Sequence, residues 1–294
     1  MESGGLPCET VVTATMDSTN RAFQPTVVPF LRWAGSKRKL LGKLVPYWGA
    51  GHCRYIEPFV GSAALFFAIQ PKSALLSDIN PDLIQALGVI RHDPAAVYEQ
   101  ARQYPPNKRA FYRLRALDPK ALTPIERAAR FLFLNRFCFN GLYRTDSKGR
   151  FNVPFAAQKT GNLPPWEQFS TAASVLERST VRCGDFERIL RSAVRAGDFV
   201  YLDPPYAVGN RRIFRQYGAD TFGLSDLKRL GTVLKMIEGR GAHFVLSYAY
   251  CREAKEAFRG WSSRRVYTHR NISGFAKHRR RAAELIVTNV SVSG

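Results

Sequence analysis

The chain has 294 residues, of which 45% are hydrophobic, so it can bury a sizeable core in one large or two smaller domains. Lys and Arg number 44 against 23 Asp and Glu, which gives a formal net charge of +21. A small-metabolite enzyme does not need that charge, whereas a protein that binds a polyphosphate does. An acidic membrane surface is the alternative, but no strongly amphipathic basic helix stands out and no apolar stretch is long enough to span a bilayer.

The N-terminal segment and the cysteines are typical of a protein in a reducing compartment. Residues 1–26 are rich in Ser, Thr and Gly and lack the basic and apolar regions of a secretion signal, so we expect a disordered tail and a cytoplasmic location. The five cysteines are far apart and form no Cys-x-x-Cys pair, and the five histidines show no metal spacing. We therefore predict reduced thiols and no bound metal.

Strands and helices alternate at both ends of the chain. The pattern first predicts a helix over 37–44, a strand over 55–59, a helix over 63–69, a strand over 74–77 and a helix to about residue 91. After residue 178 it predicts strands over 180–183, 199–202 and 243–248, a helix carrying Leu227, Leu230, Leu234 and Ile237, and an antiparallel pair over 266–268 and 285–290. This order predicts an α/β fold with a Rossmann-like, doubly wound sheet.

The middle of the chain differs, because residues 93–178 are helical and basic. Thr123-Pro124-Ile125-Glu126 predicts a helix start, and residues 140–154 read as a hairpin or ordered loop. We therefore expect a main domain over 27–92 and 179–294, interrupted by an insertion over 93–178.

The most informative motif is Asp203-Pro204-Pro205-Tyr206, directly after the apolar run 199–202. A buried parallel strand that ends at a double proline places this loop where open α/β sheets bind ligands. A carboxylate, proline carbonyls and an aromatic face suit a flat base with an exocyclic amine. The alternative is a strand followed by an ordinary proline turn.

Two further motifs follow the first two strands. Pro58, Phe59 and Gly61 form a single-glycine turn before a helix, which lets a ligand approach the backbone and favours an adenosine ligand over a dinucleotide. Asp78 comes 17 residues after Gly61, near the spacing of a carboxylate that binds ribose hydroxyls. The alternative for Asp78 is the N-cap of the next helix.

Two other segments are candidate ligand contacts. In Trp33-Ala34-Gly35-Ser36-Lys37, either a capped turn starts a helix, or a lid lays Trp33 on a ligand and points Lys37 at a carboxylate. In Gly184-Asp185-Phe186, either a plain turn follows the strand, or Asp185 and Phe186 contact the edge and face of an adenine.

Basic residues gather after residue 206 and near the C-terminus. Arg211 and Arg212 follow the double-proline loop, and a second group contains Arg264, Arg265, Arg270, Lys277, His278, Arg279, Arg280 and Arg281. Either these form a solvated face or, with their interleaved aromatic residues, they contact phosphates; the overall charge favours phosphates.

Taken together, five motifs in one order resemble the Dam-type, alpha-group DNA adenine methyltransferases. The resemblance covers residues 30–289, and its motifs are Arg32-Trp33-Ala34-Gly35-Ser36-Lys37, Glu57-Pro58-Phe59-Val60-Gly61, Leu76 to Ile84, Asn135 to Arg144 with Phe151 to Phe155, and Asp203-Pro204-Pro205-Tyr206. Three features depart from the family pattern: Ala63 replaces a frequent Gly, Arg32 replaces a Lys used near the DNA, and residues 156–165 diverge.

The resemblance implies an enzyme that moves a methyl group from S-adenosylmethionine to adenine N6 in a short motif of double-stranded DNA, with the base flipped out. GATC is the expected site. The resemblance implies that Trp33, Lys37, Asp78 and Asp203 bind the cofactor, and the motifs themselves add Gly35, Pro58, Phe59, Gly61, Asp185 and Phe186 as candidates. The candidate residues that act on the base are Asp203, Pro204, Pro205 and Tyr206. The candidate DNA contacts are Arg32, Asn140, Leu142 and Arg144, together with Arg211 and Arg212 from the basic run. A restriction endonuclease partner and a monomeric state are further expectations.

Three other activities remain as alternatives. A methyltransferase could act on cytosine N4, RNA or a glutamine amide, although Asp203 at the head of the loop favours adenine by the same resemblance. A non-catalytic DNA-binding protein could keep the fold, but Asp203 and Tyr206 are intact. A dinucleotide oxidoreductase is disfavoured by the single-glycine turn.

Overall fold

The computed structural model describes residues 24–49, 51–156, 161–206, 222–269 and 281–290. Seven strands form one sheet in the order β3-β2-β1-β4-β5-β7-β6. The strands are β1 (Arg54–Glu57), β2 (Ala74–Asp78), β3 (Ser179–Cys183), β4 (Asp198–Leu202), β5 (His243–Ala249), β6 (Ser262–His269) and β7 (Arg281–Thr288). The five strands β1 to β5 pair in parallel, and β7 pairs antiparallel with both β5 and β6.

Helices cover both faces of the sheet. In the described chain the longer helices are α2 (Ala64–Ile69), α3 (Pro81–His92), α4 (Pro94–Arg102), α5 (Lys108–Ala116), α6 (Pro124–Phe137), α7 (Trp166–Leu176), α8 (Phe186–Ala193), α9 (Leu224–Gly239) and α10 (Arg252–Ala257). Short turns of helix are η1 (Lys37–Leu40), α1 (Leu41–Leu44), η2 (Val45–Tyr47), η3 (Pro119–Ala121) and η4 (Phe139–Gly141).

The sheet separates two apolar cores because strand side chains alternate between its faces. Ile56, Val200 and Leu246 face the core formed with α8, α9 and α10. Tyr55 and Tyr201 face the opposite core, to which η1, α1, α2, α3 and α7 contribute. All residues of β4 are buried, as expected for a central parallel strand.

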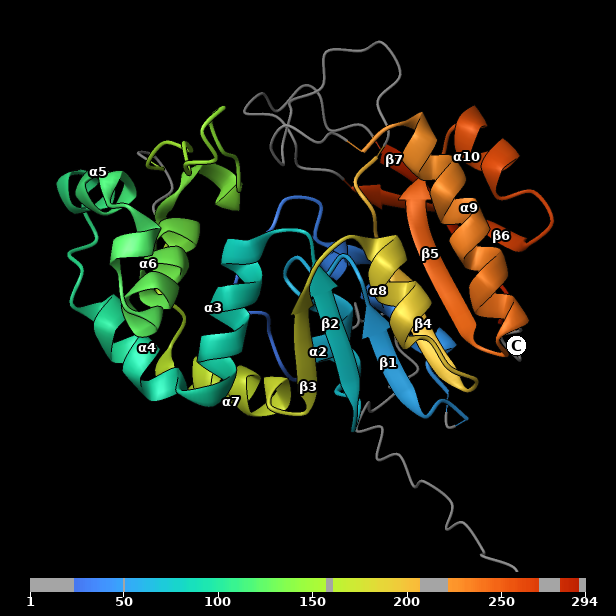
Figure 1. Ribbon diagram of the computed structural model, residues 1–294, viewed down its shortest axis with the longest axis horizontal. Helices are drawn as coiled ribbons and strands as arrows, with labels where there is room; N and C mark the ends of the chain where they lie inside the picture. Colours follow the sequence, from blue (N-terminus) through green and yellow to red (C-terminus); the bar gives the residue numbers. More distant parts are fainter. Residues whose placement is uncertain (1–23, 50, 157–160, 207–221, 270–280, 291–294) are drawn as a thin grey trace, which may run out of the picture.

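The insertion has a small core of its own, where α5 and α6 pack against the loop that follows them. Figure 1 shows α4, α5 and α6 together beyond the β3 side of the sheet, with β6, β7 and α10 at the opposite side. The helix α7 belongs to the same stretch of sequence but packs against α3 and α4. Its Phe169 is fully buried in the core beneath the sheet.

The predicted elements are confirmed, with boundaries that shift by a few residues. Thr123 and Glu126 form the expected capping box at the start of α6, each accepting a hydrogen bond from the other's backbone amide. The terminal antiparallel pair is present as β6 and β7, several residues longer than expected. The helix expected over 37–44 is instead one turn of 3₁₀ helix followed by a short α1.

Candidate active site

The strand order changes direction between β1 and β4. From β1 the chain moves outward through β2 and β3, and from β4 it moves the other way through β5. The loops after β1 and β4 therefore meet at a topological switch point, where open α/β sheets leave a ligand crevice. These loops carry the Gly61 turn and the double-proline loop, both of which the sequence analysis selected.

An ion pair lies at the start of the double-proline loop. Lys37 Nζ is 2.6 Å from Asp203 Oδ1, and it also donates a hydrogen bond to the Gly35 carbonyl at 3.1 Å. Ser247 Oγ on β5 donates to the same Asp203 oxygen at 3.1 Å and lies 2.9 Å from the Tyr201 hydroxyl. Lys37 thus points at a carboxylate, which was one of the two interpretations of its motif. Ser247 has no motif around it and was missed.

Burial and charge oppose each other in this pair. The side chain of Lys37 is 8% exposed and that of Asp203 is 19% exposed. Burial is the largest single effect and lowers the pKa of Lys37, but Asp203, Tyr206 and Glu284 together raise that pKa overall. Burial raises the pKa of Asp203, and the Lys37 ammonium opposes the rise. Each group therefore stabilises the charged form of the other in a largely water-excluded place.

Tyr206 stands beside this pair at the end of the double-proline motif. Its ring packs edge-on against Tyr248, with centroids 5.1 Å apart, and Lys37 Nζ lies 5.3 Å from its centroid. Pro204 is buried, and Pro205 and Tyr206 are partly exposed. The loop therefore places a carboxylate, a rigid backbone and a partly exposed aromatic ring together at the carboxyl end of β4.

The Gly61 turn is tight against Trp33. Gly61 has φ +44°, and a Cβ there would lie 2.7 Å from Trp33 Cδ1, so no larger residue fits without displacement. Pro58 is buried within the same turn, and Phe59 packs on Phe186. Ala63 also adopts a left-handed conformation, with φ +53°, which explains why glycine suits that position in the family.

Asp78 supports the turn from the end of β2. Its Oδ2 accepts a hydrogen bond from the Gly61 amide at 3.2 Å, and its Oδ1 accepts one from the Asn80 amide at 3.0 Å. Burial raises its pKa to about 6 against these stabilising hydrogen bonds. The alternative of an Asp78 N-cap is wrong, because Asn80 caps α3 by accepting from Asp82 and Leu83. Asp78 therefore remains a candidate ligand-binding carboxylate beside the glycine turn.

Apolar side chains continue the crevice beyond Asp78. Ile79 is 59% exposed although it sits between two buried segments, and the sequence analysis did not single it out. Phe186 is buried against Phe59 and lies beneath the Arg229 guanidinium, 4.9 Å from its ring centroid. An exposed isoleucine beside a carboxylate is a surface that a flat aromatic ligand could cover.

Asp185 has more partners than its motif suggested. It caps α8 by accepting from Glu187 and Arg188, and it forms a 2.7 Å ion pair with Arg229 on α9. Arg229 also pairs with Glu187 and Asp226, so one guanidinium joins the starts of α8 and α9. This network fixes the position of Phe186 at the edge of the crevice.

The insertion contacts the segment before the site through the side-chain amide of Asn135, which bonds the backbone of Arg32 as a neighbouring strand would. Asn135, buried on α6, accepts from the Arg32 amide at 2.8 Å and donates to the Arg32 carbonyl at 2.7 Å. Arg32 in turn donates from Nη1 to the Arg136 carbonyl at 3.1 Å. Burial and the nearby Arg32 and Arg38 lower the pKa of Arg136 to about 10. This cluster of arginines is a favourable place for an anion.

The loop after α6 presents several side chains at the surface. Asn140 is exposed with φ +55°, Leu142 is partly exposed, and Arg144 donates from Nε to Asn152 at 2.7 Å. Isolated bridges join Cys138 to Phe155 and Thr145 to Phe151, which confirms an ordered, hairpin-like loop. Phe139, 50% exposed, was missed because nothing in the sequence separates it from the buried phenylalanines nearby. Arg211 and Arg212 lie outside the described residues.

These features coincide with a known family. The chain matches the D12 class N6 adenine-specific DNA methyltransferases over residues 33–272 and belongs to that family. It is a site-specific, adenine-specific DNA methyltransferase, and its methyl donor is S-adenosylmethionine.

Several relatives match most of the chain. It is 31% identical to the type II methyltransferase M1.LlaDCHI of Lactococcus lactis subsp. cremoris, over 89% of this chain and 95% of that one. It is 34% identical to the type II methyltransferase M.MjaIII of Methanocaldococcus jannaschii, over 76% and 85% of the two chains. It is 32% identical to a DNA adenine methylase of Haemophilus influenzae, over 88% and 92%.

Among solved structures, the rRNA methyltransferase aviRa from Streptomyces viridochromogenes is 15% identical over 91% of this chain and 88% of that one, with a TM-score of 0.37. The strand order 3-2-1-4-5-7-6, with its antiparallel end, carries the assignment of a Rossmann-like methyltransferase fold. No helix within the described ranges is both long and apolar enough to cross a membrane.

The crevice fits S-adenosylmethionine on its own chemistry. Asp78 offers a carboxylate to hydroxyl groups, Gly61 lets a ligand approach the backbone, and Ile79 offers an open apolar surface. Asp203 lies at the same sheet edge, one strand from the Gly61 turn. A nucleoside needs an acceptor for its hydroxyl groups, room beside the backbone and an apolar surface for its base, and Asp78, Gly61 and Ile79 provide these three contacts.

Proposed function

We propose that Asp203, Pro204, Pro205 and Tyr206 act directly on an adenine flipped out of the duplex. The adenine N6 lone pair is conjugated with the ring and poorly nucleophilic. A hydrogen bond from N6 to Asp203 and one to the Pro204 carbonyl favour a pyramidal nitrogen whose lone pair is available. Tyr206 stacks on the base. The Lys37–Asp203 ion pair, at 2.6 Å, is the single observation that carries this proposal.

The ion pair matters because it fixes which oxygen remains for the substrate. Both hydrogen bonds that the Asp203 carboxylate accepts within the described residues go to Oδ1, from Lys37 and Ser247. Oδ2 is then the oxygen proposed to accept from N6. The bound cofactor supplies an electrophilic methyl group; as the nitrogen–carbon bond forms and the sulfur–carbon bond breaks, one N6 proton leaves to water. Asp203 therefore need not be a strong base.

The cofactor contacts are proposed at the glycine turn and the ends of β2 and β3. Gly61 and Asp78 hold the nucleoside, with the Asp78 carboxylate accepting from ribose hydroxyls. Ile79 and Phe186 lie against the adenine, and Asp185 accepts at its edge. Trp33, Gly35, Lys37, Pro58, Phe59 and Asp203 enclose the remaining part of the cofactor.

The proposed DNA contacts come from the insertion and the segment before it. Arg144 reads a guanine edge, with Asn152 holding its Nε; Asn140 contacts a base edge and Leu142 packs at a base step. Exposed Phe139 adds a second stacking surface. Arg32 binds phosphate beside Arg38 and Arg136, and Arg211 and Arg212 are proposed to contact phosphates as well.

GATC is the proposed recognition site. Relatives named as DNA adenine methylases and relatives named as type II methyltransferases both match the chain, so a restriction endonuclease partner is part of the proposal. We further propose that the enzyme acts as a monomer on duplex DNA in the cytoplasm, with residues 93–178 as its target-recognition insertion.

The first test is to incubate the protein with unmethylated genomic DNA and tritiated S-adenosylmethionine, and to map modified bases by single-molecule sequencing. We expect N6-methyladenine within GATC. Asp203→Ala should abolish the label, whereas Glu99→Gln, which removes one exposed helix ion pair, should not.

Each outcome has a distinct meaning. Methylation within another short motif would overturn GATC and keep the chemistry. Label on cytosine, or label only with RNA or protein, would overturn the adenine proposal. Full activity in Asp203→Ala would overturn the role of the double-proline loop.

A further inference from the structure

Tyr143 lies where the insertion meets the cofactor crevice. It sits between Leu142 and Arg144 in the loop after α6, and it is partly buried. Its ring stacks with Trp33, with centroids 5.9 Å apart and planes 18° apart. No motif of the sequence analysis assigned it a role.

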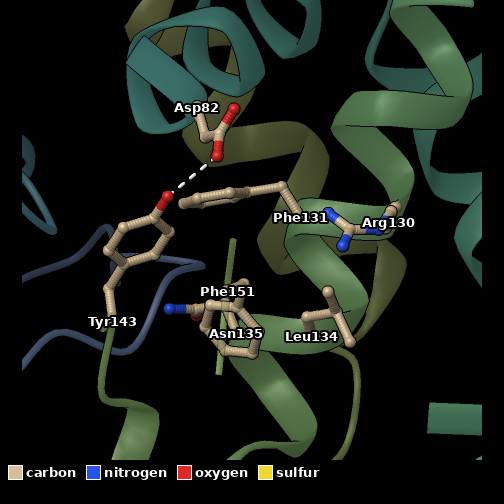
Figure 2. Close-up of a pocket in the computed structure, with 7 residues that line it drawn as sticks. All are labelled: Asp82, Arg130, Phe131, Leu134, Asn135, Tyr143 and Phe151. Carbon is tan, nitrogen blue, oxygen red and sulfur yellow. Dashed lines mark hydrogen bonds between the residues drawn. The ribbon is translucent and has the colours of Figure 1, made fainter. Parts of the chain in front are cut away.

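The hydroxyl of Tyr143 makes a second connection. It donates to Asp82 Oδ2 at 2.8 Å (Figure 2). Asp82 Oδ1 accepts from Arg127 at 2.6 Å. Burial and the Asp82 carboxylate raise the pKa of Tyr143 well above its usual range, so the hydroxyl stays a donor. Asp82 lies in the first turn of α3, four residues after Asp78.

Trp33 links the Tyr143 ring to the glycine turn. Its Cδ1 is so close to Gly61 that an added Cβ would lie 2.7 Å away. The indole therefore contacts both the Tyr143 ring and the Gly61 turn. One tyrosine of the insertion thus reaches both loops of the nucleoside crevice, the β1–α2 turn through Trp33 and the β2–α3 turn through Asp82.

We propose that Tyr143 is a positioning residue for the cofactor, because it holds Trp33 against the Gly61 turn and fixes the start of α3. The proposal rests on the proposed placement of the cofactor at Gly61 and Asp78. It means that the insertion which reads DNA also completes the cofactor crevice. Cofactor affinity then depends on a side chain whose two neighbours are proposed to touch DNA.

The test compares variants that remove different parts of Tyr143. Tyr143→Phe keeps the ring and removes the bond to Asp82, and Tyr143→Leu removes both connections. Phe151→Leu is the matched control, because Phe151 packs on the same tyrosine ring at 5.6 Å within the same pocket lining (Figure 2). Calorimetry measures S-adenosylmethionine binding without DNA, and fluorescence anisotropy measures DNA binding without cofactor.

We expect Tyr143→Leu to weaken cofactor binding about three- to tenfold, the range that an aromatic pair supports. Tyr143→Phe should fall between Tyr143→Leu and wild type, and Phe151→Leu should stay within about twofold of wild type. Because part of the effect of Tyr143 passes through Trp33, Tyr143→Leu combined with Trp33→Leu should cost less than the sum of the two single variants. KM for the cofactor should rise more than KM for DNA in Tyr143→Leu.

Three results would overturn the inference. They are wild-type cofactor affinity in both Tyr143 variants, an equal loss in Phe151→Leu, or full additivity with Trp33→Leu. If Tyr143→Leu does not fold, a cycle of Tyr143→Phe with Asp82→Asn decides. Tyr143→Phe removes only the hydroxyl donor, whereas Asp82→Asn also weakens the Arg127 ion pair, so the losses of cofactor affinity should be less than additive, and full additivity would overturn the inference. Failure of the wild type to bind S-adenosylmethionine would instead contradict the placement of the cofactor.

Discussion

Lys37 and Asp203, 166 residues apart in the chain, form a 2.6 Å ion pair at the switch point of the sheet. Removing one partner of such a pair leaves the other charge buried, which costs about 3 kcal/mol or more. We expect Lys37→Met to lower the melting temperature and to reduce kcat at least about 100-fold, because Asp203 loses the contact that orients it. Differential scanning fluorimetry and a methylation assay measure the two effects.

The double variant separates stability from catalysis. Lys37→Met combined with Asp203→Asn removes both charges, so its melting temperature should exceed that of Lys37→Met alone while its activity stays absent. A loss of stability in the double variant equal to the sum of the two single losses would show that the two residues are not energetically coupled.

Cofactor affinity should depend on the ionisation of Asp78. Burial raises its pKa to about 6, and ribose hydroxyls donate to the charged carboxylate, so binding favours the deprotonated form. Affinity should therefore fall about tenfold as the pH drops from 7 to 5, and it should level off above pH 7. Calorimetry at half-unit pH steps, with the melting temperature checked at each, measures this dependence.

Asp78→Asn is the control for this assignment. It should bind the cofactor more weakly than wild type at pH 7 and show a flat profile from pH 5 to 8. The same slope in Asp78→Asn would assign the proton to another group, such as Asp203 or Glu57, whose pKa values burial also raises.

Two glycines provide a matched pair of substitutions. Gly61→Ala places a Cβ 2.7 Å from Trp33 at φ +44°, so it should cost about 1–3 kcal/mol and weaken cofactor binding. Gly88→Ala, in the interior of α3, meets only Val181 at 3.6 Å and should stabilise the protein by about 0.5–1 kcal/mol. Urea unfolding measures both. Equal effects of the two substitutions would contradict the tight turn at Gly61.

Arg144 should govern specificity more than affinity. Losing a bidentate contact to guanine costs about 1–3 kcal/mol of discrimination, so Arg144→Ala should methylate sites altered at one base pair almost as fast as the intact site. Arg109→Ala removes an exposed charge on α5 and should weaken binding to all DNA slightly. Competition between two labelled duplexes measures the ratio. An unchanged ratio in Arg144→Ala would remove it from base readout.

The sequence by itself determined the elements and the order of the motifs. Thr123 and Glu126 cap α6, and the run 199–202 is a central strand, because caps, prolines and alternating burial act over a few residues. The motif order also indicated the family, which the comparisons confirm. The sequence did not show which residue caps α3, since Asp78 and Asn80 are both suitable caps near the start of that helix.

Only the tertiary structure decided which distant side chains meet. Ser247 reaches Asp203, Asn135 pairs with Arg32, and Tyr143 stacks on Trp33 because strand register and helix packing bring together residues 44 to 110 positions apart. No local pattern encodes such pairs, because each depends on how the whole sheet and the insertion pack. The sequence named the chemical groups of the site, and the packing of the fold chose their partners.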